Sequence, residues 1–243
     1  MRRLLKWTIP AVALGTASIG IEPLQAAVLE RTAQVAGTKV QYKVVLPNGY
    51  DPAKTYQAIL VFGGGPQTMN TVDGALDRNF RAEAEKRGYI VVAPAAPDGD
   101  LFFQGGERIF PRFLDMILAD YHVQDGRFHV AGPSNGGIAS FHVAAANPQY
   151  FRSVTAFPGY MWKATEAKLR AISKLCVFTY VGETDEYQWH EEMKREVEFL
   201  SSLGTVARYA VEKGQPHRLE TLAGAKAGRL FDGFEEAEKG CSH

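Results

Sequence analysis

Hydrophobic and polar positions along the chain change between the two-residue period of strands and the longer period of helices. Beyond residue 27, Leu29–Val35 and Thr38–Leu46 read as two strands, the second alternating, and together they predict an antiparallel hairpin. The continuous apolar run Ala58–Phe62 then predicts a strand covered on both faces, and it ends in three glycines at 63–65. The hairpin is therefore followed by a buried sheet.

Strand-like and helix-like segments alternate through the remainder of the chain. Further strands are expected at Tyr89–Ala93, Phe128–Ala131, Ser153–Phe157, Leu175–Val181 and Thr205–Val211, and helices at Ala75–Arg87, Arg108–Tyr121, Gly136–Asn147, Thr165–Ile172, Tyr187–Leu203 and Gly228–Lys239. This order predicts an α/β fold with a doubly wound, mostly parallel sheet and helices on both faces. Ligands bind such sheets beyond the carboxyl ends of the strands, so functional side chains are expected just after strands.

One short motif lies between a strand-like and a helix-like segment. Gly132-Pro133-Ser134-Asn135-Gly136 has the G-x-S-x-G pattern, after Phe128–Ala131 and before an Ala-rich run. A strand-to-helix turn of this kind holds its serine in a strained conformation that only small neighbours tolerate, and it exposes the hydroxyl above the sheet. Ser134 is therefore predicted to be a nucleophile, although the motif alone also fits an incidental Gly-rich turn.

A serine nucleophile needs a base, and the base needs an orienting carboxylate. Asp185 follows the expected strand Leu175–Val181, and His217 follows Thr205–Val211. The chain order serine, acid, histidine is the one that accompanies this type of elbow. Glu183 and Glu186 remain alternatives for the acid, and His217 could also be a solvated loop histidine.

The negative charge of a tetrahedral intermediate requires hydrogen-bond donors. The backbone N–H of Asn135, directly after the nucleophile, is the expected first donor. The second is expected in the glycine loop after Ala58–Phe62, with Gly64 as first choice and Gly65 as second. A plain flexible turn is the alternative interpretation of these glycines.

These residues resemble the α/β-hydrolase superfamily of serine hydrolases. The likeness is to compact secreted esterases grouped with polyhydroxybutyrate depolymerases and feruloyl esterases, and to the catalytic domain of prolyl oligopeptidases. It covers nearly all of residues 38–240 and rests on Leu46–Pro52, the glycines at 63–65, Asp125–Gly137, Gly182–Asp185 and His217. One departure is Phe62, where those families usually carry a histidine; the backbone donor is unaffected.

The ends and composition of the chain add a cellular context. Residues 1–26 combine a basic start with a short apolar run, which predicts a signal peptide, a hydrolase domain over 27–243, and a secreted or periplasmic protein. An uncleaved anchoring helix is the alternative. The chain has 27 basic and 27 acidic residues, so neither nucleic acid nor an anionic membrane is an expected partner, and no motif implies a metal or other cofactor. Cys176 is expected to be a small buried residue, and a bridge to Cys241 is left open.

The substrate is the least determined feature. The segment between Ser153–Phe157 and Leu175–Val181 is too short for an inserted lid, so an open site is expected. Five aromatic residues follow strands at the expected edge and could line it or simply pack, namely Phe102, Phe103, Tyr160, Trp162 and Trp189. The sequence favours a hydrolase of small or polymeric carboxylic esters, with a serine peptidase or a non-catalytic binding module of the same fold as alternatives.

Overall fold

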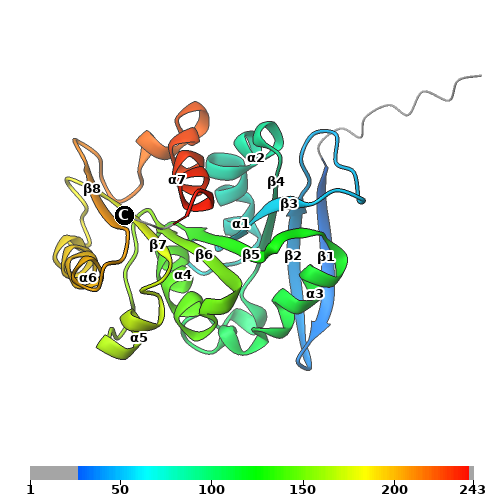
Figure 1. Cartoon of the computed structure of the whole chain (residues 1–243), viewed down its shortest axis with the longest axis horizontal. Coiled ribbons are helices and arrows are strands. Elements are labelled where there is room, and N and C mark those ends of the chain that lie inside the picture. The colour runs from blue at the N-terminus through cyan, green and yellow to red at the C-terminus, as the bar shows by residue number, and fades with distance from the viewer. Residues whose placement is uncertain (1–26, 241–243) are drawn as a thin grey trace, which may run out of the picture.

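A computed structural model describes residues 27–240; the predicted signal peptide and Cys241 lie outside this part (Figure 1). Its centre is an eight-stranded sheet in the order β1-β2-β4-β3-β5-β6-β7-β8. The strands are β1 (Val28–Val35), β2 (Thr38–Val45), β3 (Tyr56–Val61), β4 (Tyr89–Pro94), β5 (Val123–Gly132), β6 (Phe151–Ala156), β7 (Cys176–Gly182) and β8 (Ala207–Glu212). β1 and β2 form the antiparallel hairpin, and β3 to β8 run parallel. The predicted fold class is therefore confirmed.

Helices cover both faces of the sheet (Figure 1). They are α1 (Met69–Ala75), α2 (Arg81–Arg87), α3 (Arg112–Asp120), α4 (Asn135–Ala146), α5 (Glu166–Ala171), α6 (His190–Ser202) and α7 (Gly228–Glu238). α1, α2 and α7 pack on one face, and α3 to α6 pack on the other.

The run 58–62 shows how the sequence pattern produces these layers. Ala58, Leu60 and Phe62 belong to the core on the α4 side, whereas Ile59 and Val61 belong to the core under α7. All five are fully buried. Successive side chains of a strand point to opposite faces, so a strand covered twice must be apolar at every position.

Several helix boundaries differ from the predicted ones. The helix expected at Ala75–Arg87 begins at Met69 and includes a π-helical turn, Leu76–Phe80. The helix expected at Arg108–Tyr121 starts only after Pro111, which has no N–H for a helix interior. Tyr187–Trp189 precede α6 and belong to a loop instead of the helix. The first difference places additional residues beside Ser134, as described below.

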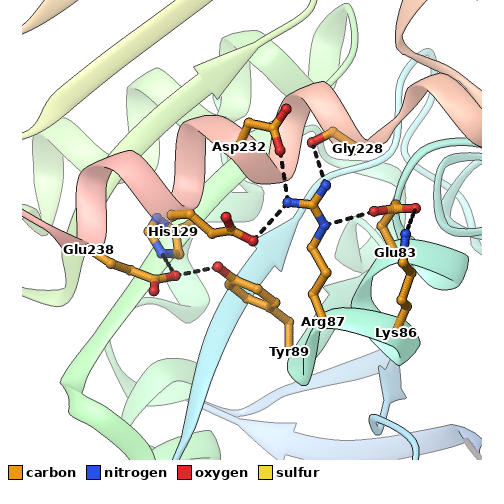
Figure 2. A network of polar contacts seen from close by, with 9 residues as sticks. Glu83, Lys86, Arg87, Tyr89, His129, Gly228, Asp232 and Glu238 are labelled. Atoms are coloured by element: carbon orange, nitrogen blue, oxygen red, sulfur yellow. Dashed lines mark hydrogen bonds and ion pairs between the residues drawn. The ribbon is translucent and has the colours of Figure 1, made fainter.

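A polar network joins α7 to α2 and to β4 (Figure 2). Arg87 donates to Asp232 and Glu235 of α7, and Tyr89 donates to Glu238. The fully buried His129 lies 2.7 Å from Ser153 Oγ, and burial lowers the pKa of its imidazole. Although this cluster contains a serine, a histidine and an acid, Ser153 is fully buried, so its role is structural.

Two further observations concern Cys176 and the helices. Cys176, on β7, is fully buried as expected and is disulfide-bonded, which the sequence had left open. Over residues 27–240, none of the helices has the length and apolar character required to cross a bilayer.

Candidate active site

Ser134 stands at a sharp turn between β5 and α4. Its backbone has φ 56° and ψ −124°, a conformation that costs energy for a residue with a side chain. Space explains the two glycines of the motif, because a Cβ would lie 2.6 Å from Phe62 O at Gly132 and 2.3 Å from the same oxygen at Gly136. The chain at the end of β3 therefore passes so close to the elbow that only glycine fits at positions 132 and 136.

The structure brings Ser134, His217 and Asp185 into one hydrogen-bonded line. His217 Nε2 is 2.9 Å from Ser134 Oγ, and His217 Nδ1 is 2.9 Å from Asp185 Oδ1. Ser134 follows β5, Asp185 follows β7, and His217 follows β8. All three lie beyond carboxyl ends of parallel strands, where the sheet rule expects them.

Asp185 is well placed to orient a histidine. Its side chain is fully buried, and Oδ1 also accepts a hydrogen bond from the backbone N–H of Tyr187 at 2.9 Å. Its Oδ2 is buried and has no hydrogen-bond partner among the described residues. A carboxylate held in this way interacts strongly with a positive charge that develops on His217.

The two alternative acids support the histidine loop instead of its ring. Glu183 accepts from the backbone N–H of Gly214 at 2.8 Å, and Glu186 accepts from the backbone N–H of His217 at 3.1 Å. Backbone N–H groups, including that of His217, hold the pKa of the Glu186 carboxyl below its usual value. Neither glutamate bonds to the imidazole.

The predicted oxyanion donors lie on both sides of Ser134. A Cβ built on Gly64 would be 3.2 Å from Pro133 O and 3.7 Å from Ser134 Cβ, so the glycine loop closely approaches the elbow. The backbone N–H groups of Gly64 and Asn135 form no hydrogen bond with other described residues. The Asn135 side chain ties the two segments together by donating to Gly65 O at 2.8 Å.

Gln67 is a site residue that the sequence analysis missed. It is fully buried, its Nε2 donates to Asn135 O at 3.3 Å, and its Oε1 accepts from Phe102 N at 2.9 Å. Its own N–H donates to Gly64 O at 3.2 Å. Gln67 therefore connects the glycine loop with the start of α4. The sequence signal that could have identified it as a site residue is its position two residues after the glycines.

A cavity of about 410 Å³ opens onto Ser134 and His217. One wall is formed by α1 and the π-helical turn, and the other by Phe157, Pro158 and the segment after His217. The helix wall contributes Asn70, Thr71, Gly74, Ala75, Arg78 and Asn79. Three of these six residues, Asn70, Thr71 and Gly74, precede the helix that the sequence analysis expected.

The five predicted aromatic wall residues do not line this cavity. Phe102 is fully buried and packs on Phe62 and Phe110 at ring distances of 4.8 and 5.9 Å, so it is a core residue. Phe103 is buried too and packs on Trp162. The prediction was wrong for Phe102 because the sequence cannot say which aromatic side chains fill the core under a loop.

Tyr160, Trp162 and Trp189 instead line a separate groove of about 630 Å³, together with Tyr187. Trp189 and Tyr187 contact the His217 ring edge-on at 4.8 and 4.5 Å between centroids. This groove therefore borders the histidine but not Ser134.

Glu196 of α6 lies at the base of the same groove. It is buried, and its two carboxylate oxygens accept from Met161 N at 3.1 and 2.9 Å. Burial raises the pKa of its carboxyl to about 7, above the ordinary value of 4.5. In the folded protein it consequently holds a proton over a pH range where the unfolded chain does not.

We expect Glu196→Gln to stabilise the protein at pH 8 by about 3 kcal/mol and to have little effect at pH 5. The native state binds more protons than the unfolded state between pH 4.5 and 7, so wild-type stability falls as pH rises through this window. Glutamine carries no charge to desolvate and retains an acceptor for Met161. Denaturant unfolding at both pH values measures this, with the exposed Glu198→Gln on the same helix as control. Equal effects of Glu196→Gln at both pH values would contradict the assignment.

Comparison with known proteins agrees with the fold. The model of a family described as putative esterase matches residues 107–227, a span that includes Ser134, Asp185 and His217. Together with the sheet topology and the strand-to-helix elbow, the structural neighbours decide the fold. The chain has the α/β-hydrolase fold.

Individual relatives are more distant. Dipeptidyl-peptidase 5 of Porphyromonas gingivalis is 31% identical over 128 residues, which is 48% of this chain and 19% of that peptidase. The chain thus matches about a fifth of the length of that relative. Among solved structures, a putative dipeptidyl aminopeptidase IV from Bacteroides ovatus superposes with a TM-score of 0.69 at 15% identity, over 88% of this chain and 36% of that one. The feruloyl esterase module from Clostridium thermocellum, complexed with sinapinate, gives 0.64 at 17% identity over 90% of both chains.

Proposed function

We propose that this α/β-hydrolase is a carboxylic ester hydrolase that forms an acyl-enzyme on Ser134. The observation that carries the proposal is the hydrogen-bonded line from Ser134 Oγ through the His217 ring to the buried Asp185 carboxylate, with 2.9 Å at both contacts. The esterase family match over residues 107–227 supports hydrolase chemistry.

In the first step, Ser134 Oγ attacks the ester carbonyl while His217 Nε2 takes its proton. The resulting imidazolium is oriented by Asp185 Oδ1, which accepts the hydrogen bond from Nδ1–H. His217 then gives the proton from Nε2 to the leaving alcohol. The products are a free alcohol and an ester between the acyl group and Ser134.

In the second step, water replaces the alcohol. His217 accepts a proton from water, the hydroxide attacks the acyl carbonyl, and the proton returns to Ser134 Oγ as the acid leaves. In both steps the negative charge on the carbonyl oxygen is stabilised by the N–H groups of Asn135 and Gly64, with Gly65 as the second choice. Loss of one such donor lowers turnover on the order of a hundredfold to a thousandfold.

A serine peptidase with the same three residues is the second candidate. The similarity to dipeptidyl-peptidase 5, at 31% identity over 128 residues, favours it. That match covers 19% of the peptidase, however, and peptide selection by the whole relative does not carry over to this chain. An amine is also a poorer leaving group than an alcohol, so the same three residues hydrolyse an ester over a lower barrier.

Two measurements test the proposal on the intact protein. A fluorophosphonate probe is expected to label the protein, and peptide mass spectrometry to locate the label at Ser134. Short-chain aryl esters are expected to be hydrolysed with a kcat/KM at least about a hundredfold above that of peptide anilides, because the barrier is lower for the better leaving group. The reverse preference would support the peptidase, and an absence of both labelling and turnover would support a non-catalytic module.

We further propose that the enzyme works outside the cytoplasm. The predicted signal peptide at residues 1–26 and the disulfide at Cys176 support export, since disulfides persist in oxidising compartments. N-terminal sequencing of the protein recovered from periplasm or medium would test this, with Ala27 as the expected first residue.

A further inference from the structure

The cavity beside Ser134 is apolar over most of its wall but carries positive charge. Gly74, Ala75, Phe157, Pro158 and Leu219 provide apolar surface. Among residues 27–240, the two charged residues of the lining are Arg78 and Arg218, and no aspartate or glutamate lines it. A ligand that enters this cavity meets a short apolar path and a positive potential.

The guanidinium of Arg78 has N–H donors that its contacts within the protein do not use. The closest contacts of its guanidinium use Nη2, which donates to Leu219 O at 3.4 Å and lies 2.6 Å from Glu220 Oε1. Nε and Nη1 make no hydrogen bond with the described residues. Arg78 is one of the residues that line the cavity, so its guanidinium is available to a ligand bound there. Arg78 itself is only partly exposed, with 21% of its side-chain surface accessible.

The position of Arg78 is fixed by the fold. It lies in the π-helical turn Leu76–Phe80, next to Asn79, whose Nδ2 donates to Leu222 O at 2.7 Å. π-helical turns occur frequently at functional sites. The turn is thus anchored to the segment that follows His217, and Arg78 lines the same cavity as Ser134.

Glu220 neutralises this positive potential only in part. Its side chain is 63% exposed, it is not part of the cavity wall, and it is shared between Arg78 at 2.6 Å and Arg218 at 4.0 Å. Two cations face one solvated carboxylate, which leaves a net positive charge for an incoming anion. Partly buried guanidinium groups bind carboxylates more strongly than neutral acceptors.

We propose that this cavity selects esters that carry a free carboxylate a few atoms from the scissile bond, and that Arg78, with Arg218 at the rim, binds this carboxylate. The inference rests on the ester hydrolase function proposed above and adds a substrate class to it. A cavity of about 410 Å³ holds a short aliphatic half-ester. The carboxylate could belong to the acyl part or to the alcohol part, and the substrates below separate the two cases.

The test uses pairs of esters that differ only in carboxylate against carboxamide. Monoethyl glutarate and the ethyl ester of glutaramic acid place the difference on the acyl side, and O-butyrylglycolate and O-butyrylglycolamide place it on the alcohol side. For one pair we expect wild-type kcat/KM to favour the carboxylate by about tenfold or more, mainly through KM. The pair that shows this preference identifies the part of the substrate that occupies the cavity.

Three variants separate substrate binding from structural support. Arg78→Met is expected to lower kcat/KM for the carboxylate ester far more than for the carboxamide and so to remove the preference, whereas Arg78→Lys should retain part of it. Glu220→Gln removes the competing carboxylate and is expected to increase the preference a few-fold. A purely structural role of Arg78 would instead lower turnover of both esters equally.

The outcomes are distinct from failure of the proposed function. Equal or better hydrolysis of both carboxamides by the wild type overturns the inference and leaves the esterase intact. An unchanged preference in both Arg78→Met and Glu220→Gln overturns it as well. If Arg78→Met does not fold, Glu220→Gln at the exposed rim still decides. No hydrolysis of any ester by the wild type would overturn the ester hydrolase itself.

Discussion

Replacing Ser134 by alanine is expected to lower kcat for ester hydrolysis by roughly a millionfold, the loss that follows deletion of the nucleophile in other enzymes of this type. Alanine has no atom that can form the acyl-enzyme. The remaining activity would come from the oxyanion donors and from substrate binding, which by themselves still exceed the reaction in water. Stopped assays with a short-chain aryl ester at high enzyme concentration measure the residual rate.

The fold should tolerate this change. Ser134 Oγ bonds only to His217 among the described residues, and the bond from its backbone N–H to Pro158 O at 2.7 Å is retained in alanine. The strained φ of 56° is the same cost for either residue. The unfolding free energy is therefore expected to stay within about 1 kcal/mol of wild type. Ser201→Ala, on the exposed face of α6, is the matched control and should keep full activity. Turnover by Ser134→Ala within tenfold of wild type would contradict the mechanism.

The order of strands and the elbow could be read from the sequence because both depend on local patterns. A strand covered on two faces must be apolar throughout, as in residues 58–62, and the turn at Ser134 needs small neighbours that glycine supplies. The sheet rule then placed Asp185 and His217 at the same edge, since carboxyl ends of parallel strands meet there. The structure brings these side chains within hydrogen-bonding distance.

The cavity could not be predicted in the same way. Its helix wall begins at Met69, where the residues have weak helical patterning, and the π-helical turn shifts Arg78 and Asn79 relative to a regular helix. Phe102 was expected at the site but fills the core against Phe62. Gln67 contacts Asn135, 68 positions later in the chain. Each of these depends on contacts between distant segments, which periodicity does not encode.

Asp185→Asn is expected to lower kcat by roughly ten-thousandfold, because it changes which nitrogen of His217 carries the proton. Asp185 Oδ1 accepts from Nδ1–H, which leaves Nε2 without a proton and able to take one from Ser134 Oγ. An asparagine amide can donate to Nδ1 instead. Nε2 would then carry the hydrogen and could no longer act as the base.

Stability provides the readout that separates this role from a structural one. Asp185 is fully buried and its Oδ2 has no hydrogen-bond partner among the described residues, so an amide of the same shape removes a buried charge at little loss of bonding. The unfolding free energy is expected to fall by no more than about 1 kcal/mol, while fluorophosphonate labelling of Ser134 slows together with turnover. Asp120→Asn, exposed at the end of α3, is the control for the chemical change. Glu186→Gln tests the alternative acid: among the described residues Glu186 accepts hydrogen bonds only from backbone N–H groups, so its loss should leave kcat within about tenfold of wild type. The opposite result, an active Asp185→Asn with an inactive Glu186→Gln, would assign the orienting carboxylate to Glu186.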